Sequence, residues 1–264
     1  MLPQEPFSDA DAYERFMGRW SRRLAPLLAT FASVEERDSV LDMGSGTGAL
    51  AAAIADAFAS VRVTGIDPSP VYVQHAQVRA SDRVRFFVGD ARMHQTPDSV
   101  FDKALSLLAI NFIPDPAQAV REMTRVTRPG GVVAAAVWDY DAGMEMLRLF
   151  WDEAVAGDPA LFARDERNMP LCRRGELAEL WRASLLQNVE EQPLTIELAF
   201  RSFDDYWLPF LGGQGPAGAH VASLSTTARA ALESRLRGRL LGERQDGPFA
   251  LQARAWAVKG VVRR

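Results

Sequence analysis

Cysteine and histidine are scarce in this chain of 264 residues, which has one cysteine, Cys172, and three histidines. A lone cysteine excludes an intrachain disulfide, and so few Cys and His residues leave little material for a Cys/His metal site. We therefore predict no bound metal. Long apolar runs are also absent, because the longest, such as residues 131–138, fall far short of the roughly 20 residues that span a bilayer.

A large excess of charge of either sign is lacking as well. Lys plus Arg number 30 and Asp plus Glu number 34, which gives a net charge of −4. This balance offers no global electrostatic reason to bind nucleic acid or an anionic membrane. The first 16 residues include acidic side chains and no apolar core, which is not typical of a signal peptide. We expect a cytoplasmic protein with no nucleic-acid partner and no membrane span; the oligomeric state stays open.

The first half of the chain alternates short apolar runs with helical patterns. The runs mostly lack strict polar alternation, which is typical of strands covered on both faces. Alternation of this kind predicts an α/β, doubly wound (Rossmann-like) sheet whose ligand crevice lies at the carboxyl ends of the strands. The expected strands are residues 39–43, 61–66, 84–88, 101–108 and 132–138.

The second half predicts two late strands, 187–200 and 249–262, which form an antiparallel pair and complete a seven-stranded, mostly parallel sheet. The glycine-rich stretch 212–218 favours a flexible loop. Near the N-terminus, apolar residues from Tyr13 to Phe31 recur at helical spacing, and Pro26 predicts two helices with a break between Gly18 and Leu24.

The most informative motif is residues 40–48, Val-Leu-Asp-Met-Gly-Ser-Gly-Thr-Gly, where a strand runs into a glycine-rich turn and a helix. Glycines admit strained backbone and close ligand approach, and a helix N-terminus offers free N–H groups. The pattern also fits a dinucleotide-binding turn. Asp67 ends the second strand and Asp90 follows the third, so one carboxylate suits a ribose diol and the other an adenine amine. A cap or turn is the structural alternative for each acid.

These residues, with the Asn111–Pro116 and Arg121–Gly131 segments, resemble class I S-adenosylmethionine (SAM)-dependent methyltransferases. The similarity covers roughly residues 13–140 and is greatest to the branch of ubiquinone/menaquinone C-methyltransferases and many small-molecule methyltransferases. The resemblance implies one methyltransferase domain over 1–264. Within it we expect an N-terminal helical cover (1–32), a SAM-binding core (38–140) and substrate-side cover segments (143–172 and 203–245).

The resemblance also implies site roles. Asp42 and the glycine turn would line the methionine part, Asp67 the ribose, Asp90 with Ala91 the adenine, and an arginine the SAM carboxylate. Arg22 is our choice for that arginine, with Arg19 and Arg23 as rivals. The full set of expected cofactor residues is Tyr13, Arg22, Asp42, Gly44, Ser45, Gly46, Thr47, Gly48, Asp67, Pro68, Ser69, Asp90, Ala91, Ser106 and Leu107.

No residue stands out as the catalyst. Candidate bases are His94, Asp139 and Tyr140, although His94 also reads as a solvent-exposed loop histidine. Aromatic and amide side chains predict a small acceptor of apolar or planar character, contacted by Trp20, Asn111, Trp138 and Trp207.

The expected reaction is in-line methyl transfer to a small molecule, with S-adenosylhomocysteine as the product. The sequence leaves open the acceptor and whether O, N, C or S is methylated. An NAD(P)-dependent oxidoreductase and a catalytically inactive SAM-binding protein are the alternatives. The oxidoreductase is disfavoured because Tyr140 lacks a lysine four residues later and Pro-Ser follows Asp67.

Overall fold

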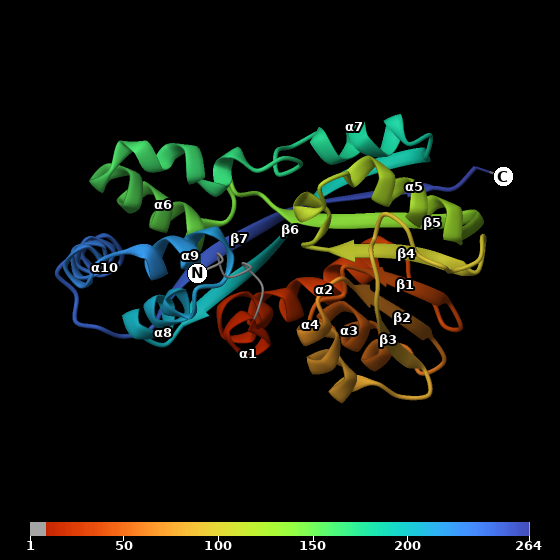
Figure 1. Cartoon of the computed structure of the whole chain (residues 1–264), viewed down its shortest axis with the longest axis horizontal. Coiled ribbons are helices and arrows are strands. Elements are labelled where there is room, and N and C mark those ends of the chain that lie inside the picture. The colour runs from red at the N-terminus through yellow and green to blue at the C-terminus, as the bar shows by residue number, and fades with distance from the viewer. Residues whose placement is uncertain (1–8, 264) are drawn as a thin grey trace.

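The computed structural model describes residues 9–263. The first eight residues of the predicted cover 1–32, and Arg264, lie outside the described part of the chain. A single seven-stranded sheet has the order β3-β2-β1-β4-β5-β7-β6 (Figure 1). Strands β1 to β5 pair in parallel, whereas β7 is antiparallel to both β5 and β6. The strands are β1 (Ser39–Met43), β2 (Arg62–Asp67), β3 (Val84–Val88), β4 (Phe101–Leu107), β5 (Thr127–Trp138), β6 (Gln187–Phe200) and β7 (Phe249–Val261).

The direction of strand addition reverses between β1 and β4, which are neighbours in the sheet. Right-handed crossovers therefore place the helices of the two halves on opposite faces. Helix α2 packs on α3, and α5 packs on β4 and β5. The helices of the core are α1 (Ala10–Tyr13), α2 (Arg19–Phe31), α3 (Ala49–Ala57), α4 (Pro70–Ala76), α5 (Pro116–Val126) and α7 (Glu176–Ala183).

A group of helices lies beyond the carboxyl ends of the parallel strands, at the left of Figure 1. Helix α6 contacts α9 and α10, and α10 also contacts α8. The long strands β6 and β7 reach into this group and join it to the sheet. The helices are α6 (Glu145–Gly157), α8 (Phe203–Trp207), α9 (Gly215–Ser223) and α10 (Thr226–Leu241), with 3₁₀ turns at Pro159–Arg164, Glu166–Asn168 and Leu208–Gly212.

Local sequence explains where several helices begin. Asp115, Ser69 and Ser225 each accept a hydrogen bond from the backbone N–H three residues later, at the starts of α5, α4 and α10. Proline follows Asp115 and Ser69 at once, where its missing N–H costs nothing. Of these three helices, α4 begins directly after the end of β2, where the predicted site residue Asp67 lies.

Two local predictions are wrong. No break separates Gly18 from Leu24, because α2 continues through Pro26, and the irregularity is instead a π-helical segment at Glu14–Gly18. The stretch 212–218 is not a flexible loop, since α9 begins at Gly215. Gly218 is a packing residue, as a Cβ there would lie 2.7 Å from the carbonyl carbon of Gly213.

Among residues 9–263, no helix is long and apolar enough to cross a membrane.

Candidate active site

The glycine turn after β1 is held against the end of β2. The N–H groups of Gly44 and Ser45 both donate to the carbonyl of Ile66, at 2.8 and 3.0 Å. Gly44, Gly46 and Gly48 have φ values of +74°, +52° and +86°, a region that other residues adopt at a cost. The turn therefore presents backbone, with little side chain, toward the strand ends.

Asp42 lies under this turn and is fully buried. Its Oδ2 accepts a hydrogen bond from Ala51 N–H at 3.2 Å, while Oδ1 has no partner in the described structure. Burial raises the pKa of the Asp42 carboxyl to about 7, and the nearby Asp67 charge adds to the rise. A buried acid with an unused oxygen is suited to a cationic hydrogen-bond donor.

Asp67 joins the turn to the second strand. Its Oδ2 accepts from Gly46 N–H and its Oδ1 from Ser69 N–H, both at 2.9 Å. Burial raises the pKa of Asp67, and the two N–H donors oppose that rise. Each carboxylate oxygen can accept a further hydrogen bond, so the side chain can serve the turn and a ligand diol together. Pro68 and Ser69 lead from Asp67 into α4, where Ser69 is the cap.

A small pocket of about 20 Å³ lies between the glycine turn and the N-terminal segment. Three buried oxygens in this region have no hydrogen-bond partner among the described residues: Asp42 Oδ1, Ser45 Oγ and Ser106 Oγ. Unpaired buried polar atoms are costly, so a ligand rich in polar groups fits here. The lining residues are Tyr13, Ser21, Asp42, Gly44, Ser45, Gly46, Thr47, Ala49, Leu50 and Leu107.

The rim of this pocket holds charged residues that sequence reasoning missed. The Glu14 carboxylate accepts from Thr47 Oγ1 at 2.5 Å and pairs with Arg22. Arg79 donates to the Thr47 carbonyl at 3.2 Å. The predicted Arg22 therefore reaches this edge, whereas Arg19 pairs with Asp205 and Arg23 with the carbonyl of Glu197. The four-residue spacing of Glu14, Gly18 and Arg22 was the available signal for Glu14.

Asp90 and Ala91 lie farther along the same strand edge, after β3. The Asp90 carboxylate is exposed and holds Arg92 at 2.7 Å, and this pairing lowers the pKa of Asp90. Ala91 is buried. Arg92 shares the carboxylate that we expected to meet a ligand, and its role was not visible in the sequence.

The predicted substrate residues are buried, and their side chains contact other residues of the chain. Trp20 packs against Arg19 and Phe200, and the indole N–H of Trp138 points at Met17 Sδ, 3.2 Å away. Trp207 stacks on Phe210 in the helical cover. Within the described chain, the indole nitrogen of Trp20 and the amide nitrogen of Asn111 are buried without an acceptor.

All three candidate bases are occupied or shielded. Asp139 is bound by Arg254 Nε at 2.8 Å, and burial raises the pKa of Tyr140 well above its usual range, which keeps the phenol protonated. His94 is not exposed as its loop position indicated. Its side chain is 5% exposed, lies 4.0 Å from Glu122 of α5, and burial lowers its pKa.

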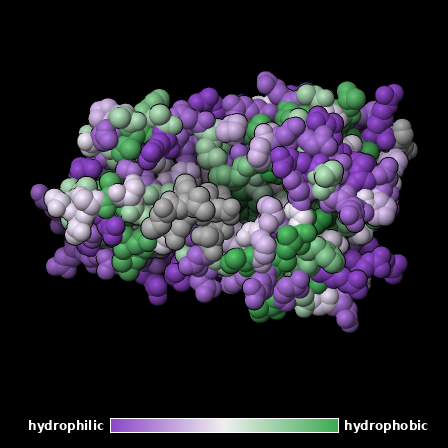
Figure 2. All heavy atoms as spheres, viewed as in Figure 1, coloured by the Kyte–Doolittle hydropathy of each residue, from purple (hydrophilic) through white to green (hydrophobic). Residues whose placement is uncertain are grey.

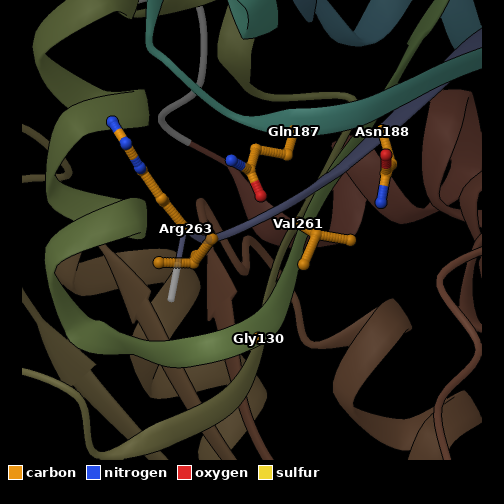
Figure 3. A pocket seen from close by; sticks show the side chains of 6 residues that line it. Gly130, Gln187, Asn188, Val261 and Arg263 are labelled. Atoms are coloured by element: carbon orange, nitrogen blue, oxygen red, sulfur yellow. The ribbon is translucent and has the colours of Figure 1, made fainter.

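The surface is hollowed between the helical cover and the strand ends, near the middle of the face in Figure 2, and hydrophobic residues lie within the hollow and along part of its border. Another pocket, of about 360 Å³, is lined by residues of β5, β6 and β7 and by the residues that follow β7, at the opposite end of the strands (Figure 3). The pairing of Gln187 and Val132 with Val261 places it at the amino ends of the parallel strands, away from the glycine turn. The glycine turn and the acids lie at the carboxyl ends of the parallel strands. We therefore assign the candidate site to that end of the sheet, beside the hollow.

Known proteins are similar to this chain in sequence and in fold. A family model described as a methyltransferase domain matches residues 41–135. The 2-methyl-6-phytyl-1,4-hydroquinone methyltransferase of Synechocystis is 34% identical over 44% of this chain and 37% of that protein. The 27-O-demethylrifamycin SV methyltransferase of Amycolatopsis mediterranei is 38% identical over 42% of this chain and 43% of that protein. The matched region spans less than half the length of these curated relatives.

The fold is similar to that of phosphoethanolamine N-methyltransferase 2 from Haemonchus contortus, solved with phosphomonomethylethanolamine and S-adenosylhomocysteine. The TM-score is 0.59 at 21% identity, covering 97% of this chain and 57% of that one. The glycine turn, Asp42 and Asp67 lie inside the family match. The region that holds the glycine turn and both acids is therefore similar in sequence to a methyltransferase domain and to small-molecule methyltransferases, and the chain shares its fold with solved methyltransferases.

Proposed function

We propose that this protein transfers the methyl group of SAM to a small-molecule acceptor. The observation that carries the proposal is the meeting of the glycine turn with two acids, Asp42 and Asp67, at one edge of the sheet. The sulfonium of bound SAM supplies an already activated methyl group. The chain must then bind, orient and exclude water, and orientation alone can contribute about 7–11 kcal/mol in favourable cases.

Each contact group has a distinct task. Asp42 Oδ1 would accept from the methionine ammonium, and Asp67 from the ribose hydroxyls. Arg22, with Arg79 beside Thr47, would meet the methionine carboxylate. Ala91 N–H and the Asp90 carboxylate would hold adenine, with Arg92 moving aside or sharing the acid.

The acceptor would enter the hydrophobic hollow beside the helical cover (Figure 2). Aromatic rings crowd this cover: Phe150 stacks on Phe210 with 4.7 Å between ring centroids, and Tyr206 and Trp207 lie next to them. These rings are buried against one another and form the apolar interior of the cover. We propose an acceptor that is largely apolar or planar, because hydrophobic residues lie at the hollow in front of this interior. Since Asp139 is tied to Arg254, catalysis by this chain would depend on alignment more than on that acid.

Isothermal titration with SAM, S-adenosylhomocysteine and NADPH tests the proposal. We expect the two adenosyl sulfur compounds to bind and NADPH not to bind. Binding of NADPH alone would support an oxidoreductase instead. Binding of SAM without turnover of any apolar or planar hydroxyl, amine, thiol or carbon acceptor would support an inactive SAM-binding protein.

Substitution of Asp67 tests the ribose contact. Removing charge-assisted hydrogen bonds in Asp67→Ala should weaken S-adenosylhomocysteine binding by about 2–3 kcal/mol, or roughly 30- to 150-fold in Kd. Asp56→Ala is the matched control, since Asp56 is an exposed acid at the end of α3. Equal affinities in the two variants, both folded by circular dichroism, would remove Asp67 from the site.

A further inference from the structure

The Glu14 carboxylate occupies a cation-lined position on the rim of the cofactor pocket. One oxygen accepts from Thr47 Oγ1 at 2.5 Å, and the other pairs with Arg22. Thr47 directly precedes Gly48, the residue that caps α3. The Glu14 side chain is 15% exposed. An acid from the N-terminal segment is thus held where a hydroxyl and a guanidinium converge.

The backbone around Glu14 is shaped for this contact. Residues Glu14–Gly18 form a π-helical segment between α1 and α2, an irregularity found frequently at functional sites. Gly18 leaves the space that the carboxylate fills, because a Cβ there would lie 2.7 Å from the Glu14 carboxyl carbon. Gly18 has ordinary helical dihedrals, so the lack of a side chain serves packing and not backbone freedom.

The pocket below Glu14 is closed to a large ligand. Its volume of about 20 Å³ compares with the roughly 300 Å³ at the lower end of ligand pockets. Tyr13, next to Glu14, lines it and contacts Ser21 at 3.2 Å. The N-terminal segment must therefore shift before a nucleoside with an amino-acid tail can enter.

We propose that the Glu14 carboxylate takes the place of the cofactor's own carboxylate beside Arg22 and Thr47, and that SAM binds by displacing it. This inference rests on the proposed function. Glu14 is then an internal competitor that sets the affinity for SAM and S-adenosylhomocysteine. The competition is between two carboxylates for one guanidinium and one hydroxyl, so it does not extend to ligands without a carboxylate.

Displacement of Glu14 would also affect the helical cover, where the acceptor would enter. Helix α1 contacts α4 and the 208–212 turn of the helical cover, and the Glu14–Gly18 segment contacts the same turn. A Cβ on Gly212 would lie 3.1 Å from Ala12 Cβ, which shows how close the two segments are. Release of Glu14 by the cofactor therefore loosens the contact between the N-terminal segment and the cover, where the acceptor would enter.

Two ligands and two variants test the proposal. S-adenosylhomocysteine carries the amino-acid carboxylate, and 5′-methylthioadenosine lacks it. We expect Glu14→Gln to bind S-adenosylhomocysteine about tenfold more tightly than the natural chain, because the closed state loses its ion pair. Affinity for 5′-methylthioadenosine should stay within twofold, roughly the precision of titration. Gly18→Ala should act in the same direction, since its Cβ excludes the Glu14 carboxylate.

Asp11→Asn is the matched control, because it removes one negative charge from the same segment at an exposed side chain. We expect it to leave both affinities unchanged. Unchanged or weaker S-adenosylhomocysteine binding in folded Glu14→Gln would overturn the proposal, as would equal tightening for both ligands. If neither ligand binds the natural chain, the proposed function itself fails; if both bind it and the variants do not differ, only the role of Glu14 fails.

Discussion

Asp42 combines full burial with one hydrogen bond, from Ala51 N–H, and burial raises its pKa to about 7. At neutral pH its carboxyl is therefore protonated in about half of the ligand-free molecules. A cationic ammonium placed at Oδ1 favours the ionised form and expels that proton. Protonation of Asp42 therefore makes ligand binding at this site depend on the pH of the solution.

We predict that S-adenosylhomocysteine binding at pH 7 releases about half a proton per site. Titration calorimetry in phosphate and in Tris measures this, because the binding enthalpies differ by the buffer's ionisation heat times the protons released. Asp42→Asn should bind more weakly and show no buffer dependence. The same buffer dependence in that variant would mean that the proton comes from another group.

Gly44 is required by conformation and by space. Its φ is +74°, and a Cβ would lie 2.4 Å from Ala109 Cβ. We predict that Gly44→Ala lowers the free energy of unfolding by about 2–3 kcal/mol, from strain and overpacking together. Urea denaturation measures the change.

Gly238→Ala is the companion substitution. Gly238 lies inside α10, and nothing lies within 4 Å of a Cβ there. Alanine should stabilise by about 0.5–1 kcal/mol, as it does in exposed helix interiors. A similar loss of stability in both variants would contradict the special status that we give to the turn.

At the scale of the elements, stacked aromatic rings join the helices and turns of the helical cover to one another. Phe210, in the 208–212 turn, stacks on Phe150 of α6 and meets Phe16 of the N-terminal segment edge-on at 5.0 Å. We predict that Phe210→Ala costs about 3–5 kcal/mol, measured by urea denaturation. Leu208→Ala changes the same turn at a side chain that is 55% exposed and should cost less than about 0.5 kcal/mol. Equal costs would show that the rings do not hold the cover together.

Strands were predictable because their apolar runs carry the signal directly. Residues 39–43, 84–88 and 187–200 are strands at the predicted bounds, and antiparallel β7 follows its predicted range to within a residue. The strand predicted at 132–138 begins earlier, at Thr127. There the backbone of Gly130 and Gly131 bonds to Val262, a partner far away in sequence that the local pattern could not reveal.

The two failures share one physical cause, which is close packing between residues four or five apart that single-residue preferences do not encode. Pro26 predicts a break after Gly18, and the glycines of 212–218 predict a flexible loop. Gly18 and Gly218 are instead small so that another group can lie against each of them. In the site, the glycine turn and the acids after the strands were predictable because motif and strand end coincide. For the pairing of Glu14 with Arg22, the four-residue spacing through Gly18 was the one signal, and it does not specify the π-helical turn on which the pairing depends.

Across the whole molecule, two buried carboxyls set the pH dependence of stability. Burial raises the pKa of both Asp42 and Glu166 to about 7, and Glu166 accepts a hydrogen bond from the Trp151 indole at 2.6 Å. A pKa raised by folding means that the folded state holds the proton more tightly. The stability from these groups is complete below about pH 4 and is lost as the pH rises to about 7.

We predict that these two carboxyls lower the unfolding free energy of the ligand-free protein by about 5 kcal/mol between pH 5 and pH 8. His94 and His220, whose pKa values burial lowers, oppose part of this loss. Paired acids such as Asp90, Asp205 and Asp246, whose pKa values are lowered, stay ionised across this window. Urea denaturation at several pH values measures the loss. The Asp42→Asn, Glu166→Gln double variant should flatten the profile, and an unaltered slope would contradict the assignment.

The pairing of Phe200 with Phe249 has a consequence for how this fold can change. These residues close the β6–β7 ladder, so residues 201–248 leave and re-enter the sheet at neighbouring positions. A long excursion between adjacent ends costs the chain little more entropy than a short one. This part of the cover can therefore be exchanged as one segment. Under the function that we propose, such an exchange between relatives would change the acceptor and leave the strand ends of β1, β2 and β3 unaltered.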